Sequence, residues 1–224
     1  MKRVILTTLI VFVLFSCKKE KNNIDFGYDY FPMEEGRYVE YDVLRVWHDE
    51  DLNPKHDTIQ YRLRTVIGEE VIDNSGRLAR KFFQYRYDKN TGAEIDQRVW
   101  TRVIDGKRGE VVEENQRMIR MIFPVKKNEE WNVNAFNTLE KLKVYYLDHN
   151  QSRLVNGHQF ENTAKIVYDD FLSLVDYRKK HEVYAKGIGL VERSFKDFTI
   201  NNFDTLTIKK GEETHYKLTS YGKQ

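Results

Sequence analysis

Residues 38–47 read Tyr-Val-Glu-Tyr-Asp-Val-Leu-Arg-Val-Trp, and their side chains alternate between apolar and polar. Val39, Tyr41, Val43 and Trp47 fall on one face, with Arg45 as the exception. A period of two is typical of a β-strand that turns one face to a core and the other to water. Such one-sided burial is a feature of antiparallel sheets. These residues therefore predict an antiparallel strand.

The same alternation recurs along the chain, beginning with residues 58–67, and turn sequences separate the runs. Asn74-Ser75-Gly76, Asp105-Gly106 and Asn156-Gly157 are turn or hairpin signals. Aromatic and β-branched residues, which favour strands, are abundant. We expect about a dozen strands, at the 8–12-residue spacing typical of a sandwich or barrel.

Residues 169–180 are the best candidate for a short helix. Phe171, Leu172 and Val175 lie roughly at helical spacing, whereas Leu172, Leu174 and Asp176 fit a strand nearly as well. The sequence therefore predicts an all-β, mainly antiparallel protein with at most one or two short helices.

Other segments carry further expectations. Residues 138–147 fit either state, and we prefer a strand because β-branched and aromatic residues cluster there. Gly187 and Gly189, two positions apart in an apolar stretch, predict a bulge or a sharp bend. Residues 195–200, 204–208 and 215–220 are expected to form three closing strands.

The first residues have the organisation of an export signal. Lys2 and Arg3 precede an almost wholly apolar run that ends at Phe15, and Ser16 and Cys17 follow. A run of about a dozen apolar residues is shorter than the ~20 that a membrane-spanning helix needs. It has the length of the apolar core of a signal peptide.

The sequence Leu14-Phe15-Ser16-Cys17 resembles the lipobox of bacterial lipoproteins. The resemblance implies a signal peptide over residues 1–16, a diacylglyceryl group on the sulfur of Cys17 and an acyl chain on its new amino terminus. Two or more such chains anchor a protein stably to a membrane. No aspartate follows Cys17, and in such lipoproteins this favours the outer membrane.

The polar residues after Cys17 have nothing to bury. We expect residues 17–27 to contain the lipidated cysteine and a flexible tether, and residues 28–224 to form a single β-rich domain. Without the signal, the chain has 224 − 16 = 208 residues, and its 37 − 2 = 35 basic side chains balance 35 acidic ones. This balance argues against nucleic acid as a partner. A chain with one cysteine has no intramolecular disulfide.

Two short motifs resemble small envelope lipoproteins of uncharacterised function from Gram-negative bacteria. They are Phe31-Pro32-x-x-x-Gly36-x-Tyr38 and Tyr184-Ala185-Lys186-Gly187-Ile188-Gly189-Leu190-Val191. The resemblance implies a strongly curved sheet, which is an open barrel as in lipoprotein carriers or a closed one as in lipocalins. Phe-Pro occurs both at residue 31 and at residue 123, which is consistent with two half-sheets or with coincidence.

No group of residues has the spacing of a known catalytic, metal or cofactor site. His48-Asp49-Glu50-Asp51 with His56 is the densest set of metal-ligand types, but it lacks a ligand spacing and favours a solvated loop. There is no G-x-S-x-G nucleophile motif. We therefore predict no catalytic residue, no metal and no cofactor.

The aromatic residues leave two interpretations open. They fill the core of the sheet, or Trp47, Trp100 and Trp131 line an apolar concavity that binds a ligand. The sequence thus predicts a non-catalytic protein, lipid-anchored in the cell envelope at the outer membrane and facing the periplasm. Its expected ligand is an apolar molecule, a glycan or a partner protein. The alternatives are a carboxylate-dependent hydrolase and a structural subunit of an outer-membrane complex.

Overall fold

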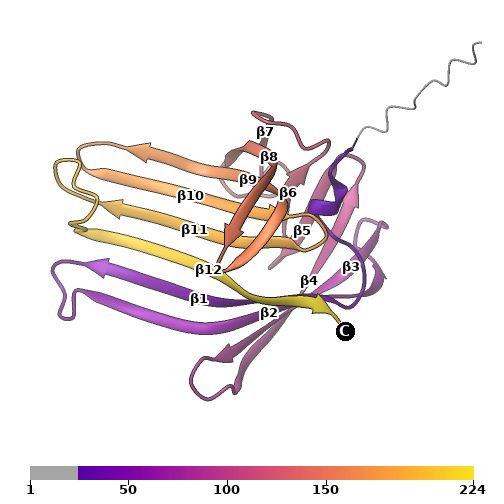
Figure 1. Cartoon of the computed structure of the whole chain (residues 1–224), viewed down its shortest axis with the longest axis horizontal. Coiled ribbons are helices and arrows are strands. Elements are labelled where there is room, and N and C mark those ends of the chain that lie inside the picture. Colours follow the sequence, from indigo (N-terminus) through magenta and orange to yellow (C-terminus); the bar gives the residue numbers. More distant parts are fainter. Residues whose placement is uncertain (1–24) are drawn as a thin grey trace, which may run out of the picture.

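The computed structural model describes residues 25–224, which form one antiparallel sheet of twelve strands (Figure 1). One turn of 3-10 helix, η1 (Tyr28–Tyr30), precedes the sheet. The strands are β1 (Arg37–Asp49), β2 (His56–Ile72), β3 (Leu78–Asp88), β4 (Glu94–Asp105), β5 (Arg108–Glu113), β6 (Gln116–Ile122), β7 (Glu130–Asn132), β8 (Lys143–Val155), β9 (His158–Leu172), β10 (Asp176–Ala185), β11 (Gly189–Thr199) and β12 (Lys210–Lys223). The prediction of an all-β, antiparallel protein is confirmed. The expected signal, Cys17 and most of the expected tether lie outside the described residues.

Two consecutive meanders make up the sheet. Strands β1 to β6 pair in sequence, strands β7 to β12 do the same, and the pairing of β1 with β12 joins the two runs. This central pairing extends from Arg37 opposite Lys223 to Asp49 opposite Lys210. Phe31-Pro32 precedes the first run and Phe123-Pro124 precedes the second.

The two outer edges of the sheet, β6 and β7, approach each other and nearly close it into a barrel. The N–H of Ile119 in β6 donates to the carbonyl of Val133, just after β7, at 2.9 Å. The indole N–H of Trp131 donates to the carbonyl of Ile119 at 3.0 Å. The hydroxyl of Tyr146 in β8 donates to the carbonyl of Ile122 at 2.9 Å and accepts from its N–H at 3.1 Å. We call this junction the seam.

The segment before β1 packs into one end of the closed part. Tyr30 and Phe31 are almost fully buried. The hydroxyl of Tyr30 donates to the side-chain oxygen of Asn150 and accepts from its backbone N–H. The ring of Phe31 lies so close to Gly109 of β5 that a Cβ there would be 3.0 Å from the ring. Asp25, which the sequence assigns to the tether, pairs with Lys186 beside the β10–β11 turn.

The helix expected over residues 169–180 does not form. This segment is the end of β9, a turn and the start of β10, with Lys180 opposite Asp169 in the ladder. Phe171, Leu172 and Val175 are exposed, so their helical spacing does not reflect a buried face. The strand alternative is correct for Leu172 and Asp176, whereas Leu174 lies in the turn between the two strands.

Two other expectations need correction. Residues 204–208 form no strand and contribute one isolated bridge, between Asn201 and Asp204. Gly187 and Gly189 lie at the tight turn between β10 and β11, both with positive φ, rather than at a bend within one strand. The strand preferred near residues 138–147 is present from Lys143 onward.

Strands β9 to β12, β1 and β2 continue together beyond the closed part, toward the left of Figure 1. Among residues 25–224, no helix is both long and apolar enough to cross a membrane.

Candidate functional site

The concave interior of the sheet contains a buried carboxylate. Glu182 of β10 has no exposed surface and lies opposite Arg193 of β11, whose Nε donates to Oε1 at 2.7 Å. The hydroxyls of Tyr168 and Tyr184 donate to the other oxygen at 2.8 and 2.7 Å. Burial disfavours the carboxylate, but the charge of Arg193 and these hydroxyls more than compensate and hold the pKa of Glu182 below its usual value.

Arg102 of β4 lies in the same interior without such a partner. Its side chain is 93 % buried, and its Nε has no hydrogen-bond partner among residues 25–224. No carboxylate of the described chain forms an ion pair with it, and its guanidinium carbon lies 3.7 Å from the ring centroid of Phe31. A cation–π contact stabilises a desolvated cation by about 2 kcal/mol. Removing a charge from water costs several kcal/mol, so Phe31 offsets only part of the cost.

Arg102 nevertheless remains charged at neutral pH. Burial lowers the pKa of its guanidinium to about 10, which is still well above 7. The interior thus holds a positive charge that no described side chain neutralises.

The other arginines that line this interior each have a carboxylate partner. The pairs are Arg37 with Glu34 at 2.7 Å, Arg120 with Glu113, and Arg193 with Glu182. Among these arginines, only Arg102 forms no ion pair within residues 25–224.

Arg102 borders a cavity of about 100 Å³, whose walls include Tyr41, Thr65, Gln84, Trp100, Tyr184 and Arg193. Sites for drug-sized ligands occupy roughly 300–1,000 Å³. This cavity therefore has room for a small polar group or for water, and not for a lipid chain.

The three tryptophans considered as ligand-binding residues lie in three separate places. Trp100 lines the interior cavity and also an open groove of about 590 Å³ outside it. Trp131 is buried in the seam, 4.7 Å from the ring centroid of Tyr146. Trp47 lies beside the β1–β2 turn, with Arg45 over its ring at 4.8 Å. The structure does not bring them together around one concavity.

The segment predicted as a solvated loop is shorter than expected, because His48 and Asp49 end β1 and His56 begins β2, and these residues make surface contacts. His48 faces Glu213 at 3.3 Å, Asp49 pairs with Lys210 at 3.1 Å, and His56 lies opposite His48 in the ladder. Across residues 25–224, no three His, Cys, Asp or Glu side chains are placed to hold a metal ion.

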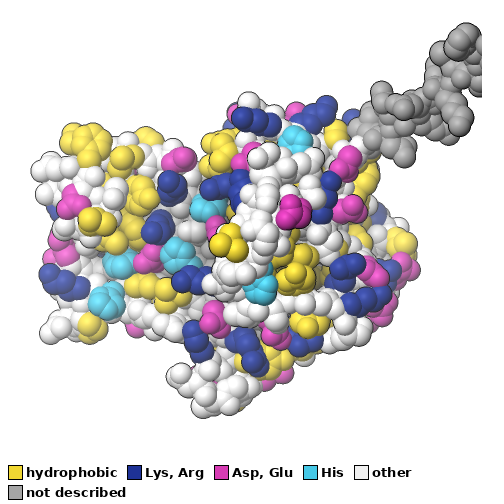
Figure 2. Space-filling view, viewed as in Figure 1, with side chains coloured by type: hydrophobic (Ala, Val, Ile, Leu, Met, Phe, Trp, Pro, Cys, Tyr) yellow, Lys and Arg dark blue, Asp and Glu magenta, His cyan; other side chains and the backbone are white. Residues whose placement is uncertain are grey.

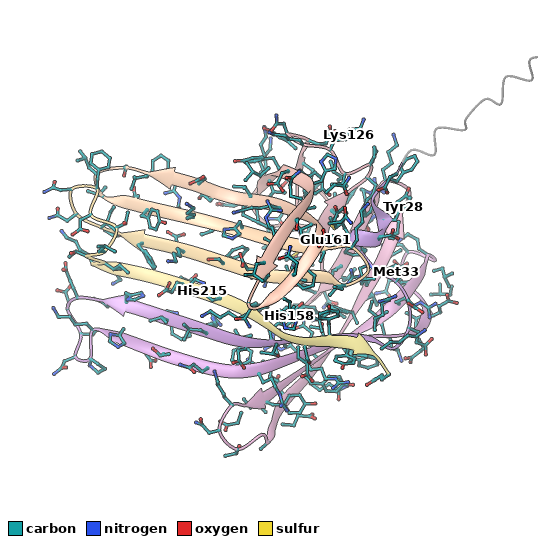
Figure 3. The ribbon with its side chains drawn as sticks, in the orientation of Figure 1. Tyr28, Met33, Lys126, His158, Glu161 and His215 are labelled. Atoms are coloured by element: carbon teal, nitrogen blue, oxygen red, sulfur yellow. The ribbon has the colours of Figure 1, made fainter. Side chains whose placement is uncertain are left out.

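A Ser–His–Glu chain includes His215, which Figure 3 labels, and Figure 2 shows several His side chains, in cyan, on the face that both views present. The hydroxyl of Ser194 is 3.3 Å from Nδ1 of His215, and Nε2 of His215 is 2.8 Å from Glu213. Nucleophilic catalysis also needs free N–H groups to stabilise an oxyanion. β11 is paired on both sides, by β10 and β12, so its backbone N–H groups are used within the sheet. We therefore interpret this chain of residues as surface polar contacts.

Sequence reasoning missed Arg102. In β4 the sequence suggests alternation of Val99, Thr101 and Val103, but both Val103 and Arg102 are buried. An arginine in a strand normally lies on the solvated face. Arg102 is buried because the segment before β1 packs against it through Phe31, and no pattern within β4 indicates that contact.

Comparisons with known proteins do not show a family for this chain. No protein-family model and no curated protein matches the chain significantly. One solved structure that matches is of a candidate lipoprotein from Parabacteroides distasonis, with 12 % sequence identity. The match covers 85 % of this chain and 98 % of that one, with a TM-score of 0.38.

Proposed function

We propose that the protein is a non-catalytic, lipid-anchored envelope protein that binds a small anion inside its β-sheet body. The observation that carries the proposal is the buried, charged guanidinium of Arg102 at the wall of a cavity, which pairs with no carboxylate and whose Nε has no hydrogen-bond partner among residues 25–224. An uncompensated buried charge costs stability. A bound anion would remove this cost.

The chemistry of the site favours a carboxylate, phosphate or sulfate group. A guanidinium offers planar N–H donors that match the oxygens of such groups. Gln84 also lines the cavity, and its side-chain amide is a second donor. The hydroxyls of Tyr41 and Tyr184 are already engaged, with Leu190 and Glu182. The ligand would be a free small anion or the anionic end of a larger molecule.

The anchoring and location rest on the sequence. The charged start, the apolar run and Cys17 support lipidation, and the near-neutral body supports a role without nucleic acid. We propose the outer membrane, with the body facing the periplasm and no metal or other cofactor. The membrane itself is then one partner, held through the lipid on Cys17.

The alternatives gain no support from the interior. A carboxylate-dependent hydrolase needs free carboxyl groups facing a substrate, whereas Glu182 and Glu113 are both paired with arginines. No feature of the described residues specifically favours a structural subunit.

Thermal unfolding of the detergent-solubilised protein tests the anion site. Acetate, phosphate and sulfate should be added separately at constant ionic strength. At least one should raise the Tm, because a ligand at a hundred times its Kd stabilises the folded state by about 2.7 kcal/mol.

Arg102→Met should abolish this rise, whereas Arg45→Met should retain it, because Arg45 is partly exposed and lies over Trp47. Equal responses of the wild type and Arg102→Met, or no response to any of the three anions, would refute the site. Intact mass spectrometry tests the anchor separately. A mass corresponding to residues 17–224 plus acyl chains is expected, and an unmodified Cys17 with the leader attached would refute lipidation.

A further inference from the structure

One edge of the sheet is open along part of β4. β4 pairs with β3 from Glu94 opposite Tyr87 to Arg102 opposite Arg80. On its other side it pairs with β5 only from Thr101 onward. Residues 94–100 therefore have no partner strand on that side among the described residues. In Figure 1 the β3–β4 hairpin projects from the bottom of the molecule.

An open edge of this kind can pair with another strand. Alternate residues along it direct N–H and C=O groups outward, and natural proteins usually cover or distort such edges. Residues 94–100 contain no proline, and Ile95 and Val99 expose about half of their surface, 54 % and 51 %. The edge therefore offers both backbone groups and apolar side chains.

The sequence of this edge is complementary to itself. It reads Glu-Ile-Asp-Gln-Arg-Val-Trp, with Gln97 at its centre. Two copies that pair antiparallel about Gln97 place Ile95 opposite Val99, and Asp96 opposite Arg98. Apolar pairs and opposite charges directly across a ladder are both stabilising. The same pairs recur on each side of the two-fold axis, as a symmetric dimer requires.

The neighbouring registers are less favourable. Each copy must keep the same face toward the interior, so the register can shift only in steps of two. One such shift places Asp96 opposite Asp96, and the other places Arg98 opposite Arg98. Like charges directly opposite each other are destabilising, so the register about Gln97 is the one that the charges select.

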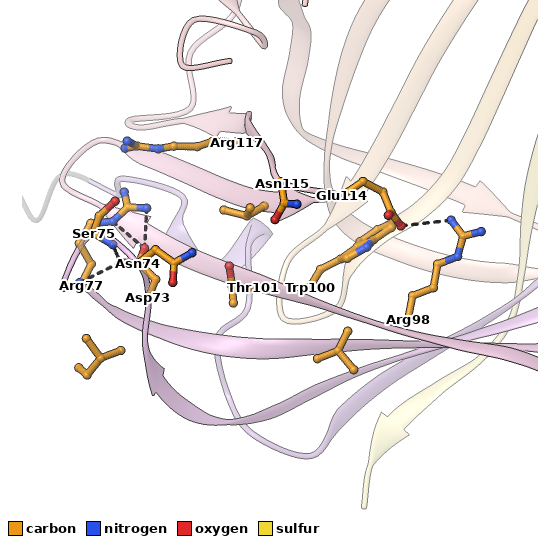
Figure 4. Close-up of a pocket in the computed structure, with 13 residues that line it drawn as sticks. Asp73, Asn74, Ser75, Arg77, Arg98, Trp100, Thr101, Glu114, Asn115 and Arg117 are labelled. Carbon is orange, nitrogen blue, oxygen red and sulfur yellow. Dashed lines mark hydrogen bonds and ion pairs between the residues drawn. The ribbon is translucent and has the colours of Figure 1, made fainter. Parts of the chain in front are cut away.

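We infer that the open edge of β4 is a homodimer interface, in which residues 94–100 of two copies pair antiparallel about Gln97. In this dimer all seven residues of the open edge have a partner, because β5 pairs with β4 only from Thr101 onward. An open groove of about 590 Å³ adjoins the end of this edge, where Arg98, Val99 and Trp100 face the β2–β3 and β5–β6 turns (Figure 4). Arg98 now makes only loose contacts, 3.6 Å from Glu114 and 3.9 Å from Asp96, and is 44 % exposed. It can reach Asp96 of the second copy, whose two carboxylate oxygens each contact Arg86 of their own chain and each retain a second lone pair.

Disulfide cross-linking tests this register. Directly opposed residues of an antiparallel pair have Cα atoms about 4.5–5.5 Å apart, which is within the range that a disulfide spans. The full-length Gln97→Cys variant, oxidised in detergent, should therefore form a linked dimer of twice the chain mass. The wild-type chain, treated in the same way, shows whether any linkage runs through Cys17.

Asn90→Cys is the matched control, because Asn90 is exposed at the tip of the same hairpin. In the proposed dimer the two copies of residue 90 are on the order of 40 Å apart at ~3.4 Å per residue, so no link should form. Adding Arg98→Asp to Gln97→Cys places like charges opposite each other and should abolish the link. A maleimide-reactive Gln97→Cys that stays monomeric would overturn the inference. So would a link that forms equally at Asn90→Cys or that survives Arg98→Asp.

Discussion

Gly211, at the start of β12, lies where any side chain would collide with the neighbouring strand. Its φ is +140°, and a Cβ added there would be 2.1 Å from the carbonyl oxygen of Asp197. A flexible side chain could move aside, but this oxygen belongs to the backbone of β11, which is held in the ladder. Gly211 is therefore required by both its conformation and its surroundings.

We expect Gly211→Ala to lower the free energy of unfolding by more than about 2 kcal/mol, since strain of 1–3 kcal/mol adds to the collision. Gly76→Ala is the matched control. Gly76 has a φ of +76°, but a Cβ there would meet nothing within 4 Å. The free energy of unfolding of this variant should fall by only ~1–2 kcal/mol, which is the cost of a left-handed backbone for a residue with a Cβ. Urea denaturation measures both, and equal losses would show that the collision with Asp197 is relieved at little cost.

Glu182 should make stability depend on pH. Burial works against its carboxylate, but Arg193 and Arg120 with two tyrosine hydroxyls bring its folded-state pKa below 4.5. The stabilisation is thus fully present above pH 4.5 and is lost as the pH falls toward the folded-state pKa. Within that window this single group should change the unfolding free energy by about 1.4 kcal/mol per pH unit.

Glu182→Gln isolates this contribution from those of the other carboxylates. The variant should be clearly less stable than the wild type at pH 7, because the charge of Arg193 loses its partner. The difference between the two proteins should shrink as the pH falls below 4.5. Urea denaturation at a series of pH values measures it, and a difference that stays constant would contradict the assignment.

At the scale of the elements, one hydroxyl makes two of the hydrogen bonds across the seam. Tyr146 of β8 satisfies both the N–H and the C=O of Ile122 at the edge of β6. Tyr146→Phe leaves these two backbone groups without a partner, and each unsatisfied buried group costs about 1–3 kcal/mol. We expect lower stability and faster hydrogen exchange at the amide of Ile122.

Tyr145→Phe serves as the control for this change. Tyr145 directly precedes Tyr146 in the same strand, and its hydroxyl has no hydrogen bond to the part of the chain described here. Its substitution should leave both the stability and the exchange rate near those of the wild type. If the two variants behaved alike, the seam would not depend on the hydroxyl of Tyr146.

The elements were predictable where one face is buried along the whole strand. Val39, Tyr41 and Val43 are all buried, as the period of two in β1 predicts. The helix prediction from Phe171 and Leu172 was wrong because both residues are apolar yet exposed near a hairpin turn, where no packing enforces a pattern. Arg102 could not be foreseen as part of a site, because its burial depends on Phe31, a residue 71 positions away along the chain.

At the scale of the whole molecule, the sheet should unfold as one unit. The twelve strands belong to one hydrogen-bonded sheet, and the two meanders share both the β1–β12 pairing and the seam. We expect tryptophan fluorescence, with Trp47 in the first meander and Trp131 in the second, to follow the same urea transition as far-UV circular dichroism. Two separate transitions would contradict a single domain.

The near-closure of the sheet was beyond prediction from the sequence. The choice between an open and a closed barrel depends on whether β6 meets β7, and this rests on contacts such as that between Tyr146 and Ile122. No periodic pattern encodes a contact between two strand edges. The strand count and the antiparallel pairing, by contrast, follow from local alternation and turn signals.

The position of β12 in the middle of the sheet has a consequence for biosynthesis. Arg37 of β1 pairs with Lys223, which is 223 − 37 = 186 positions later. The first meander must therefore remain without its central neighbour until β12 has been synthesised. Premature termination before residue 210 would leave β1 and β11 as bare edges, and quality-control proteases would be expected to remove such a chain.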